Sequence, residues 1–127
     1  MKRVLLLSSL MFVMTMNLSC SREESVATVN PLLEEWTTEF GVPPFDKIKA
    51  EHYEPAFEAA MQMHNAEIEA IVNFEEEPTF ENVVLALDNA GIELSKINLV
   101  FGMLSASDLD DQMQEVQNKM MPLLEQH

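Results

Sequence analysis

The sequence is poor in cysteine, glycine and basic residues, and each shortage excludes a class of protein. The single cysteine, Cys20, cannot form an internal disulfide, which excludes a small secreted fold held by disulfides. The three glycines are too few to build a glycine-rich phosphate-binding loop in addition to the turns that need glycine. Seven Lys and Arg against 22 Asp and Glu give a net charge of −15, which repels phosphate backbones. We therefore expect no nucleic-acid partner.

The remaining composition favours a small all-α domain. Apolar residues make up 47% of the 127 residues and charged residues 23%, which is typical of a globular chain. Glu, Ala, Leu, Met and Gln, all good helix formers, dominate the part after the leader. We expect a small helical bundle of about three long helices over residues 31–127.

The first nineteen residues predict a signal peptide. Met1-Lys2-Arg3 is a short basic start, and the run from Val4 to Met16 is almost wholly apolar. About thirteen helical residues span roughly 20 Å, which is too short for a hydrocarbon core of about 30 Å. A basic start followed by a short apolar run indicates export and not a membrane-spanning helix.

Cys20 is the candidate lipidation site. Cleavage after the small Ser19 would leave Cys20 as a lipid-carrying amino terminus, although Asn17 stands where lipoprotein signals usually place Leu. The alternative is ordinary signal cleavage with Cys20 as an incidental free thiol. Residues 20–30 predict a flexible tether. We expect an exported cell-envelope lipoprotein, on the periplasmic side or the outer surface of a Gram-negative bacterium, with Cys20 as its membrane anchor.

The first long helix is predicted at about residues 50–73. Gly41 to Pro44 excludes a helix before it, and Pro55 is tolerable if it falls in the first turn. The apolar face is defined by steps of three and four residues: Tyr53, Ala56, Phe57, Ala60, Met61, His64, Ile68, Ile71 and Val72.

A second helix is predicted from Thr79, as its N-cap, to about Ser105, with Glu81 near its positive end. Gly91 and Gly102 would weaken this helix, so we expect a neighbouring helix to approach them closely. Its apolar stripe comprises Phe80, Val83, Val84, Leu87, Ala90, Leu94, Ile97, Phe101 and Leu104.

A third helix is predicted after Ser107 or Asp108, either of which can act as its N-cap. Pro122 should kink or end this helix. Because the apolar pattern continues to His127 without a terminating glycine, the region 31–127 looks truncated. The predicted inner face comprises Leu109, Met113, Val116, Met120 and Leu124.

No catalytic residue and no metal ligand can be assigned from the residues themselves. A hydrolytic zinc site needs about three protein ligands, and His52, His64 and His127 form no His-x-x-x-His pattern. His64 and Glu67 lie three residues apart and can in principle share a metal, but no third ligand is evident. His64 is better explained as the polar edge of the apolar face, and His52 as a surface residue at a helix start.

The acidic run Glu75-Glu76-Glu77 is better explained as a solvated loop than as an acid/base pair or a calcium site. It has neither the spaced Asp residues nor the central glycine of a calcium-binding loop. The residues alone therefore predict a helical scaffold without cofactor.

Several ordered blocks of the sequence resemble the amino-terminal region of bacterial peptidyl-dipeptidases, which belong to the thimet oligopeptidase-like zinc metallopeptidases. The resemblance covers about residues 30–127. The blocks are Asn30–Leu32, Phe40–Ile48, His52–Met61, Glu67–Ile71, Pro78–Leu87, Phe101–Ala106 and Pro122–His127.

This resemblance implies a mostly helical enzyme of several hundred residues with a deep channel between two halves, part of whose wall comes from this region. Family members bind zinc through a His-Glu-x-x-His helix and a later glutamate, and a zinc-bound water cleaves short peptides. Those elements follow His127 in family order, so no site residue is transferred to this chain. Oligopeptides and zinc are thus implied for the full-length enzyme, and the chain alone is expected to be inactive.

Two functions remain open. The first is an amino-terminal fragment of a peptidyl-dipeptidase or an endo-acting oligopeptidase of that family. The second is a stand-alone acidic helical lipoprotein that binds a partner at the cell envelope.

Overall fold

The computed structural model describes residues 29–127. The predicted signal peptide at residues 1–19, the lipidation of Cys20 and most of the predicted tether at 20–30 lie outside the described residues. Within 29–127 every regular element is helical, which confirms the predicted all-α bundle. None of the described helices is both long enough and apolar enough to cross a membrane.

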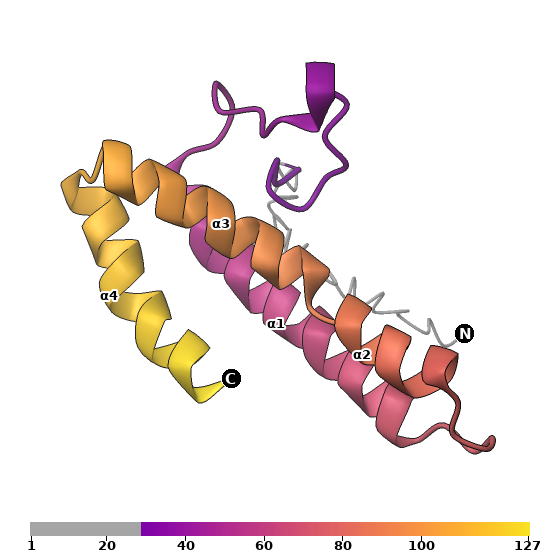
Figure 1. Ribbon diagram of the computed structural model, residues 1–127. Helices are drawn as coiled ribbons and strands as arrows, with labels where there is room; N and C mark the ends of the chain where they lie inside the picture. Colours follow the sequence, from indigo (N-terminus) through magenta and orange to yellow (C-terminus); the bar gives the residue numbers. More distant parts are fainter. Residues whose placement is uncertain (1–28) are drawn as a thin grey trace, which may run out of the picture.

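The bundle is a long helical hairpin with a fourth helix against one end. Helix α1 packs against α3 along its amino-terminal part and against α2 further on, while α4 diverges from α3 and returns to α1 (Figure 1). A single turn, η1, precedes α1. The elements are η1 (Glu39–Gly41), α1 (Ala50–Val72), η2 (Phe80–Leu85, a π-helical turn), α2 (Ala86–Asn89), α3 (Ile92–Ser107) and α4 (Asp111–Gln126).

The core is built around three aromatic rings. Phe101 of α3 meets Tyr53 and Phe57 of α1 edge to face, with ring centroids 5.0 and 5.6 Å apart. Met113 and Met120 of α4 belong to the same buried cluster. Burial of one such side chain stabilises a fold by about 1.5–3 kcal/mol, so this cluster holds α1, α3 and α4 together.

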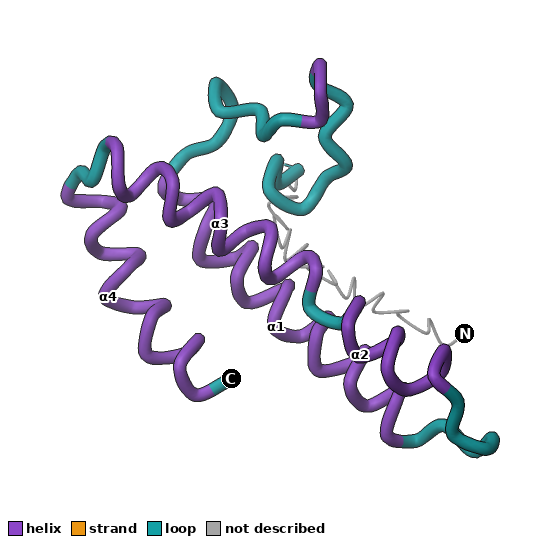
Figure 2. Tube along the Cα trace, viewed as in Figure 1, coloured by secondary structure: helices purple, strands orange, loops and turns teal. Residues whose placement is uncertain are grey.

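The segment before α1 is mostly loop (Figure 2) but is packed against the bundle. Leu32 is fully buried in the core. The Trp36 indole Nε1 donates a hydrogen bond of 2.9 Å to the carbonyl of Pro31, and the ammonium of Lys96 lies 4.6 Å from the Trp36 ring centroid. The segment before α1 therefore packs against the bundle through Leu32 and contacts α3 through Trp36.

Helix α1 occupies the predicted range, but Pro55 lies beyond the first turn, contrary to our expectation. Its ring nitrogen cannot donate to the carbonyl of Glu51. The helix continues because Pro55 is exposed, so the carbonyl that loses its partner can bond to water.

The predicted second helix is divided in two, and this part of the prediction is wrong. The Thr79 N-cap is confirmed, since its hydroxyl accepts a hydrogen bond from the Asn82 N–H at 3.1 Å. Helix α2 ends at Asn89, and Gly91 has φ +75°, a left-handed conformation that glycine tolerates. Close approach is confirmed at Gly91, where a Cβ would lie 3.1 Å from the His64 ring, but not at Gly102, which has open space around it.

The third helix begins later than predicted. Ser107 ends α3, and Asp110 is the N-cap of α4, because its carboxylate accepts a hydrogen bond of 2.8 Å from the Met113 N–H. Pro122 neither ends α4 nor marks its boundary, since the helix runs on to Gln126 and the proline is exposed. Leu109, predicted on the inner face, is 46% exposed because it precedes the helix.

Candidate functional site: a groove between α1 and α4

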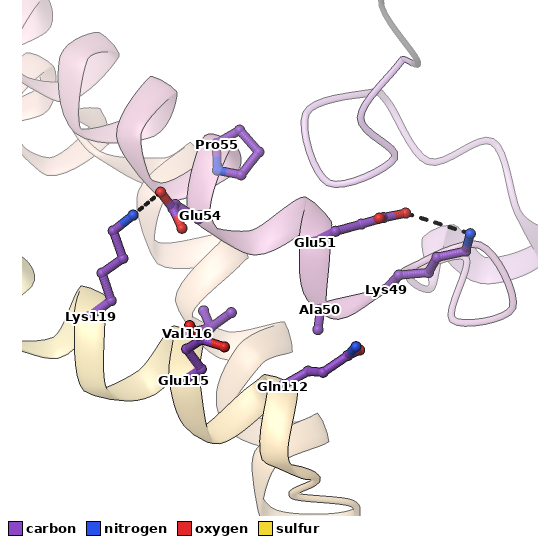
Figure 3. Close-up of a pocket in the computed structure, with 9 residues that line it drawn as sticks. All are labelled: Lys49, Ala50, Glu51, Glu54, Pro55, Gln112, Glu115, Val116 and Lys119. Carbon is purple, nitrogen blue, oxygen red and sulfur yellow. Dashed lines mark hydrogen bonds and ion pairs between the residues drawn. The ribbon is translucent and has the colours of Figure 1, made fainter.

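A groove of about 590 Å³ lies between the first turns of α1 and the first half of α4 (Figure 3). It forms because α4 meets α1 at only one end of the long hairpin. Its walls are lined by apolar, polar and charged side chains: Lys49, Ala50, Glu51, Glu54, Pro55, Gln112, Glu115, Val116 and Lys119.

An ion pair between Glu54 and Lys119 joins the two walls of the groove (Figure 3). The hydrogen bond from the Lys119 ammonium to Glu54 raises the pKa of that lysine, and the nearby carboxylates of Glu58 and Glu115 act in the same direction. Lys49 and Glu51 lie 3.6 Å apart, but both side chains are 70% exposed, so water screens this pair. The groove is therefore a mixed-charge surface, with one ordered ion pair across it.

The lining of the groove contains no Ser, Thr, Cys or His, which are the usual nucleophiles and neutral-pH bases of hydrolases. Its carboxylates face water and lysines. The groove thus offers no hydroxyl, thiol or imidazole group, and the part of the chain that the structure describes has no group of three possible metal ligands there.

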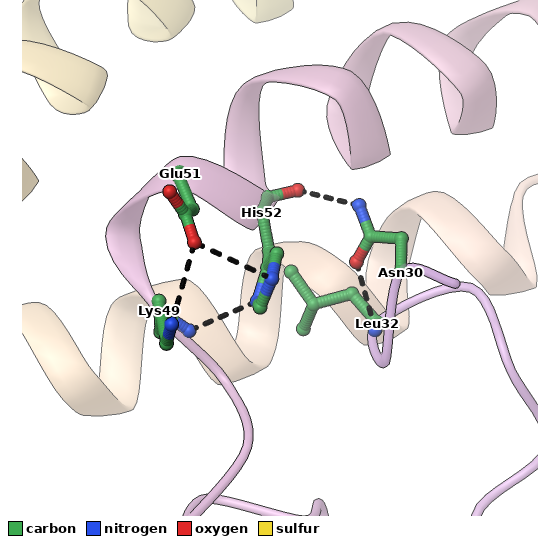
Figure 4. Close-up of polar contacts among 5 residues, drawn as sticks. All are labelled: Asn30, Leu32, Lys49, Glu51 and His52. Carbon is green, nitrogen blue, oxygen red and sulfur yellow. Dashed lines mark hydrogen bonds and ion pairs between the residues drawn. The ribbon is translucent and has the colours of Figure 1, made fainter. Parts of the chain in front are cut away.

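His52 helps to cap α1 (Figure 4). Its Nδ1 accepts a hydrogen bond of 3.1 Å from the backbone N–H of Lys49, and its carbonyl accepts one of 2.8 Å from the Asn30 amide. The Asn30 side-chain oxygen also accepts from the Leu32 N–H at 3.0 Å. These bonds tie the segment before α1 to the start of that helix, so His52 has a structural role.

The structure brings His64 and His127 together, a pairing that the sequence does not reveal. His64 Nδ1 and His127 Nε2 lie 2.9 Å apart, which links the middle of α1 to the end of α4. Glu67, considered above as a co-ligand of His64, instead accepts a hydrogen bond of 2.8 Å from the backbone N–H of Gly91. Within residues 29–127, therefore, no third metal ligand joins the two histidines.

Residues 29–127 contain no group of three His, Cys, Asp or Glu side chains that is suited to a metal ion. The donors that are present thus do not fit a catalytic zinc, which needs three protein ligands and an open position. Glu75, Glu76 and Glu77 are exposed between α1 and η2.

Tyr53 has a pKa far from its ordinary value. Burial raises its pKa to about 12, because ionisation would place a phenolate in the aromatic core. Its hydroxyl has no hydrogen-bond partner among the described residues. Sequence periodicity placed Tyr53 in the core, but it could not show the unpaired hydroxyl.

No protein-family model matches the chain. Two curated proteins are similar to it, and both are named dipeptidyl carboxypeptidase. The protein from Salmonella typhimurium is 39% identical over 89 residues, which are 70% of this chain and 13% of the relative. The protein from Escherichia coli is 37% identical over 91 residues, which are 72% of this chain and 13% of the relative.

The matches support the resemblance stated above, with a clear limit on its extent. They cover more than two thirds of this chain but only a small share of either relative. The chain is therefore related in sequence to a segment that makes up 13% of the length of these dipeptidyl carboxypeptidases.

Proposed function

We propose that this chain is the amino-terminal helical part of a zinc-dependent peptidyl-dipeptidase that hydrolyses short peptides. The observation that carries this proposal is the identity of 37–39% to two dipeptidyl carboxypeptidases over about 90 residues. The all-helical fold agrees with a scaffold role, since the paired faces of α1, α3 and α4 form one continuous core. In this proposal the catalytic zinc is held by residues of the longer enzyme.

The proposed role of the chain is mechanical. The aromatic cluster of Tyr53, Phe57 and Phe101 fixes the hairpin, and Met113 and Met120 join α4 to the same core. A rigid hairpin of this kind can form a wall that limits access of large substrates to an active site. Oligopeptides are the substrates we propose for the complete enzyme.

The proposed location is the cell envelope, with a lipid on Cys20. The support is the short apolar leader that ends in Ser19-Cys20. Metabolic labelling with a radioactive fatty acid tests it, since the full chain should take up label and the Cys20→Ser variant should not. Equal labelling of both chains, or of neither, would remove the anchor from the proposal.

A segment exchange tests the enzymatic proposal. In the exchange protein, the matched residues of the Escherichia coli relative are replaced by those of this chain. Its release of dipeptide from a blocked tetrapeptide is measured. A homologous scaffold should leave kcat/KM within about tenfold of the parent, because the reacting groups lie outside the exchanged segment. The matched control carries Phe57→Asp in the exchanged segment and should be inactive, because a charge is then buried in the core.

A folded exchange protein that binds zinc but releases no dipeptide would contradict this proposal. The second candidate is a stand-alone binding protein, which the mixed-charge groove between α1 and α4 favours. Under that alternative the full chain alone should be monomeric, melt cooperatively and leave an apolar-surface dye unbound.

A further inference from the structure

The far end of the hairpin carries an apolar surface that no other described element covers. We define the tip surface as Phe80, Val84, Leu85 and Leu87, whose exposed fractions are 64, 51, 44 and 56%. Together with Asp88 they line a groove of about 540 Å³. This end lies away from α4 and from residues 29–49 (Figure 1).

The exposure of the tip surface does not come from a badly formed helix. Thr79 and Asn82 form reciprocal side-chain to backbone hydrogen bonds of 2.7 and 3.1 Å at the start of η2. Asn82 also donates to the carbonyl of Glu77 at 3.0 Å. A well-capped segment that presents several large apolar side chains to water is typical of a docking surface.

The charges around the tip surface have one sign. Glu81 and Asp88 lie within the segment, and Glu75, Glu76 and Glu77 precede it. The sequence has no Lys or Arg from residue 50 to residue 95. Basic residues beside the apolar face of an occupant would therefore be attracted to this surface. A second copy of this chain, with a net charge of −15, would instead bring like charge to the same place.

We propose that the tip surface docks an amphipathic helix with Lys or Arg on its flanks, supplied by the remaining part of the longer peptidase. This inference rests on the proposed function, in which most of the enzyme lies outside the chain, and its support is that the match covers 13% of each relative. Helix-in-groove packing places apolar side chains of the occupant at spacings of three and four residues against Val84 and Leu87. Its basic flanks then meet Glu81 and Asp88.

A synthetic probe tests the chemistry of the occupant. The probe is an amphipathic helical peptide of Leu and Lys, and its binding to the full chain is measured by fluorescence anisotropy. A helix with Glu in place of Lys is the charge control, and we expect it to bind at least tenfold more weakly. Equal binding of the two peptides would overturn the charge argument.

Paired substitutions test the location. Val84→Gln together with Leu87→Gln removes apolar surface without a change of charge, and it should weaken binding of the Lys peptide about tenfold. The matched control is Leu123→Gln on α4, which is 41% exposed and lies outside the tip surface. It should leave binding unchanged, and an equal loss in both variants would place the peptide elsewhere and refute the proposal. Asp88→Asn should weaken binding of the Lys peptide about two- to threefold at low salt.

The exchange protein separates this inference from the proposed function. With Val84→Gln and Leu87→Gln in its exchanged segment it should melt several degrees lower, while the same pair in the full chain alone should leave the melting temperature unchanged. An active exchange protein that melts at the same temperature with either set of residues would refute docking and leave the proposed function intact. An inactive exchange protein with native tip residues would contradict the proposed function, and the peptide measurements would still test the tip surface.

Discussion

The carboxylate of Glu67 on α1 accepts a hydrogen bond of 2.8 Å from the backbone N–H of Gly91, the N-cap of α3. A negative side chain at this place compensates the positive end of the helix. The same contact fixes the break between α2 and α3, since Gly91 is also pressed against the ring of His64. The contacts of Gly91 with Glu67 and His64 thus set the position of the break between α2 and α3.

Gly91→Ala should destabilise the chain by about 1–2 kcal/mol, because a Cβ is strained at φ +75°. The added atom would also lie 3.1 Å from the His64 ring, which would have to shift. Urea unfolding of the full chain measures the difference. Gly102→Ala is the control, because this glycine lies within α3 with open space around it, and it should stabilise by about 0.5–1 kcal/mol. Equal stability of the two variants would contradict the role of Gly91.

Tyr53 should make the fold sensitive to alkali. Its pKa is raised to about 12 in the folded chain, against about 10 when unfolded. Because the folded chain holds the Tyr53 proton more tightly than the unfolded chain, the protonated side chain contributes to the free energy of unfolding. This contribution is complete below pH 10 and is lost as the pH rises toward 12. The loss should be about 1 kcal/mol at pH 11.

Tyr53→Phe is the matched test of that claim. The hydroxyl has no described partner, so its removal should leave stability at pH 7 unchanged or improved. Between pH 10 and 12 the variant should lose less stability than the parent. Since Tyr53 is the only tyrosine, ultraviolet absorption reports its ionisation directly. An ordinary tyrosine titration in the folded chain would refute the burial argument.

Glu54→Gln should lower the pKa of Lys119 toward its ordinary value, because the hydrogen bond to Glu54 is the largest cause of the rise. Nuclear magnetic resonance of the lysine side chain during a pH titration measures this shift. Glu51→Gln serves as the control, since Glu51 lies near Lys49 and not near Lys119. An equal shift in both variants would mean that general charge, and not the ion pair, sets the pKa.

The sequence predicted α1 well because its apolar residues recur without interruption from Tyr53 onward. It failed at Gly91, since a glycine within a helical pattern is compatible with both continuation and a break. The contacts that decide this, with His64 and Glu67, come from a helix more than twenty residues earlier. Tertiary packing therefore determined what local propensity left open.

The start of α4 shows a second limit. Ser107, Asp108 and Asp110 are all good N-caps, and only the bond from the Met113 N–H identifies Asp110. The groove between α1 and α4 and the His64–His127 contact join residues more than sixty positions apart. No pattern in a single sequence brings such residues together, whereas the absence of a local zinc motif was visible at once.

Zinc binding and hydrolysis by the purified full chain test the central claim most directly. We expect no tightly bound zinc and no zinc-dependent release of dipeptide from a blocked tetrapeptide, because residues 29–127 hold no group of three suitable ligands. One equivalent of zinc that survives dialysis, together with dipeptide release that a chelator abolishes, would contradict the account.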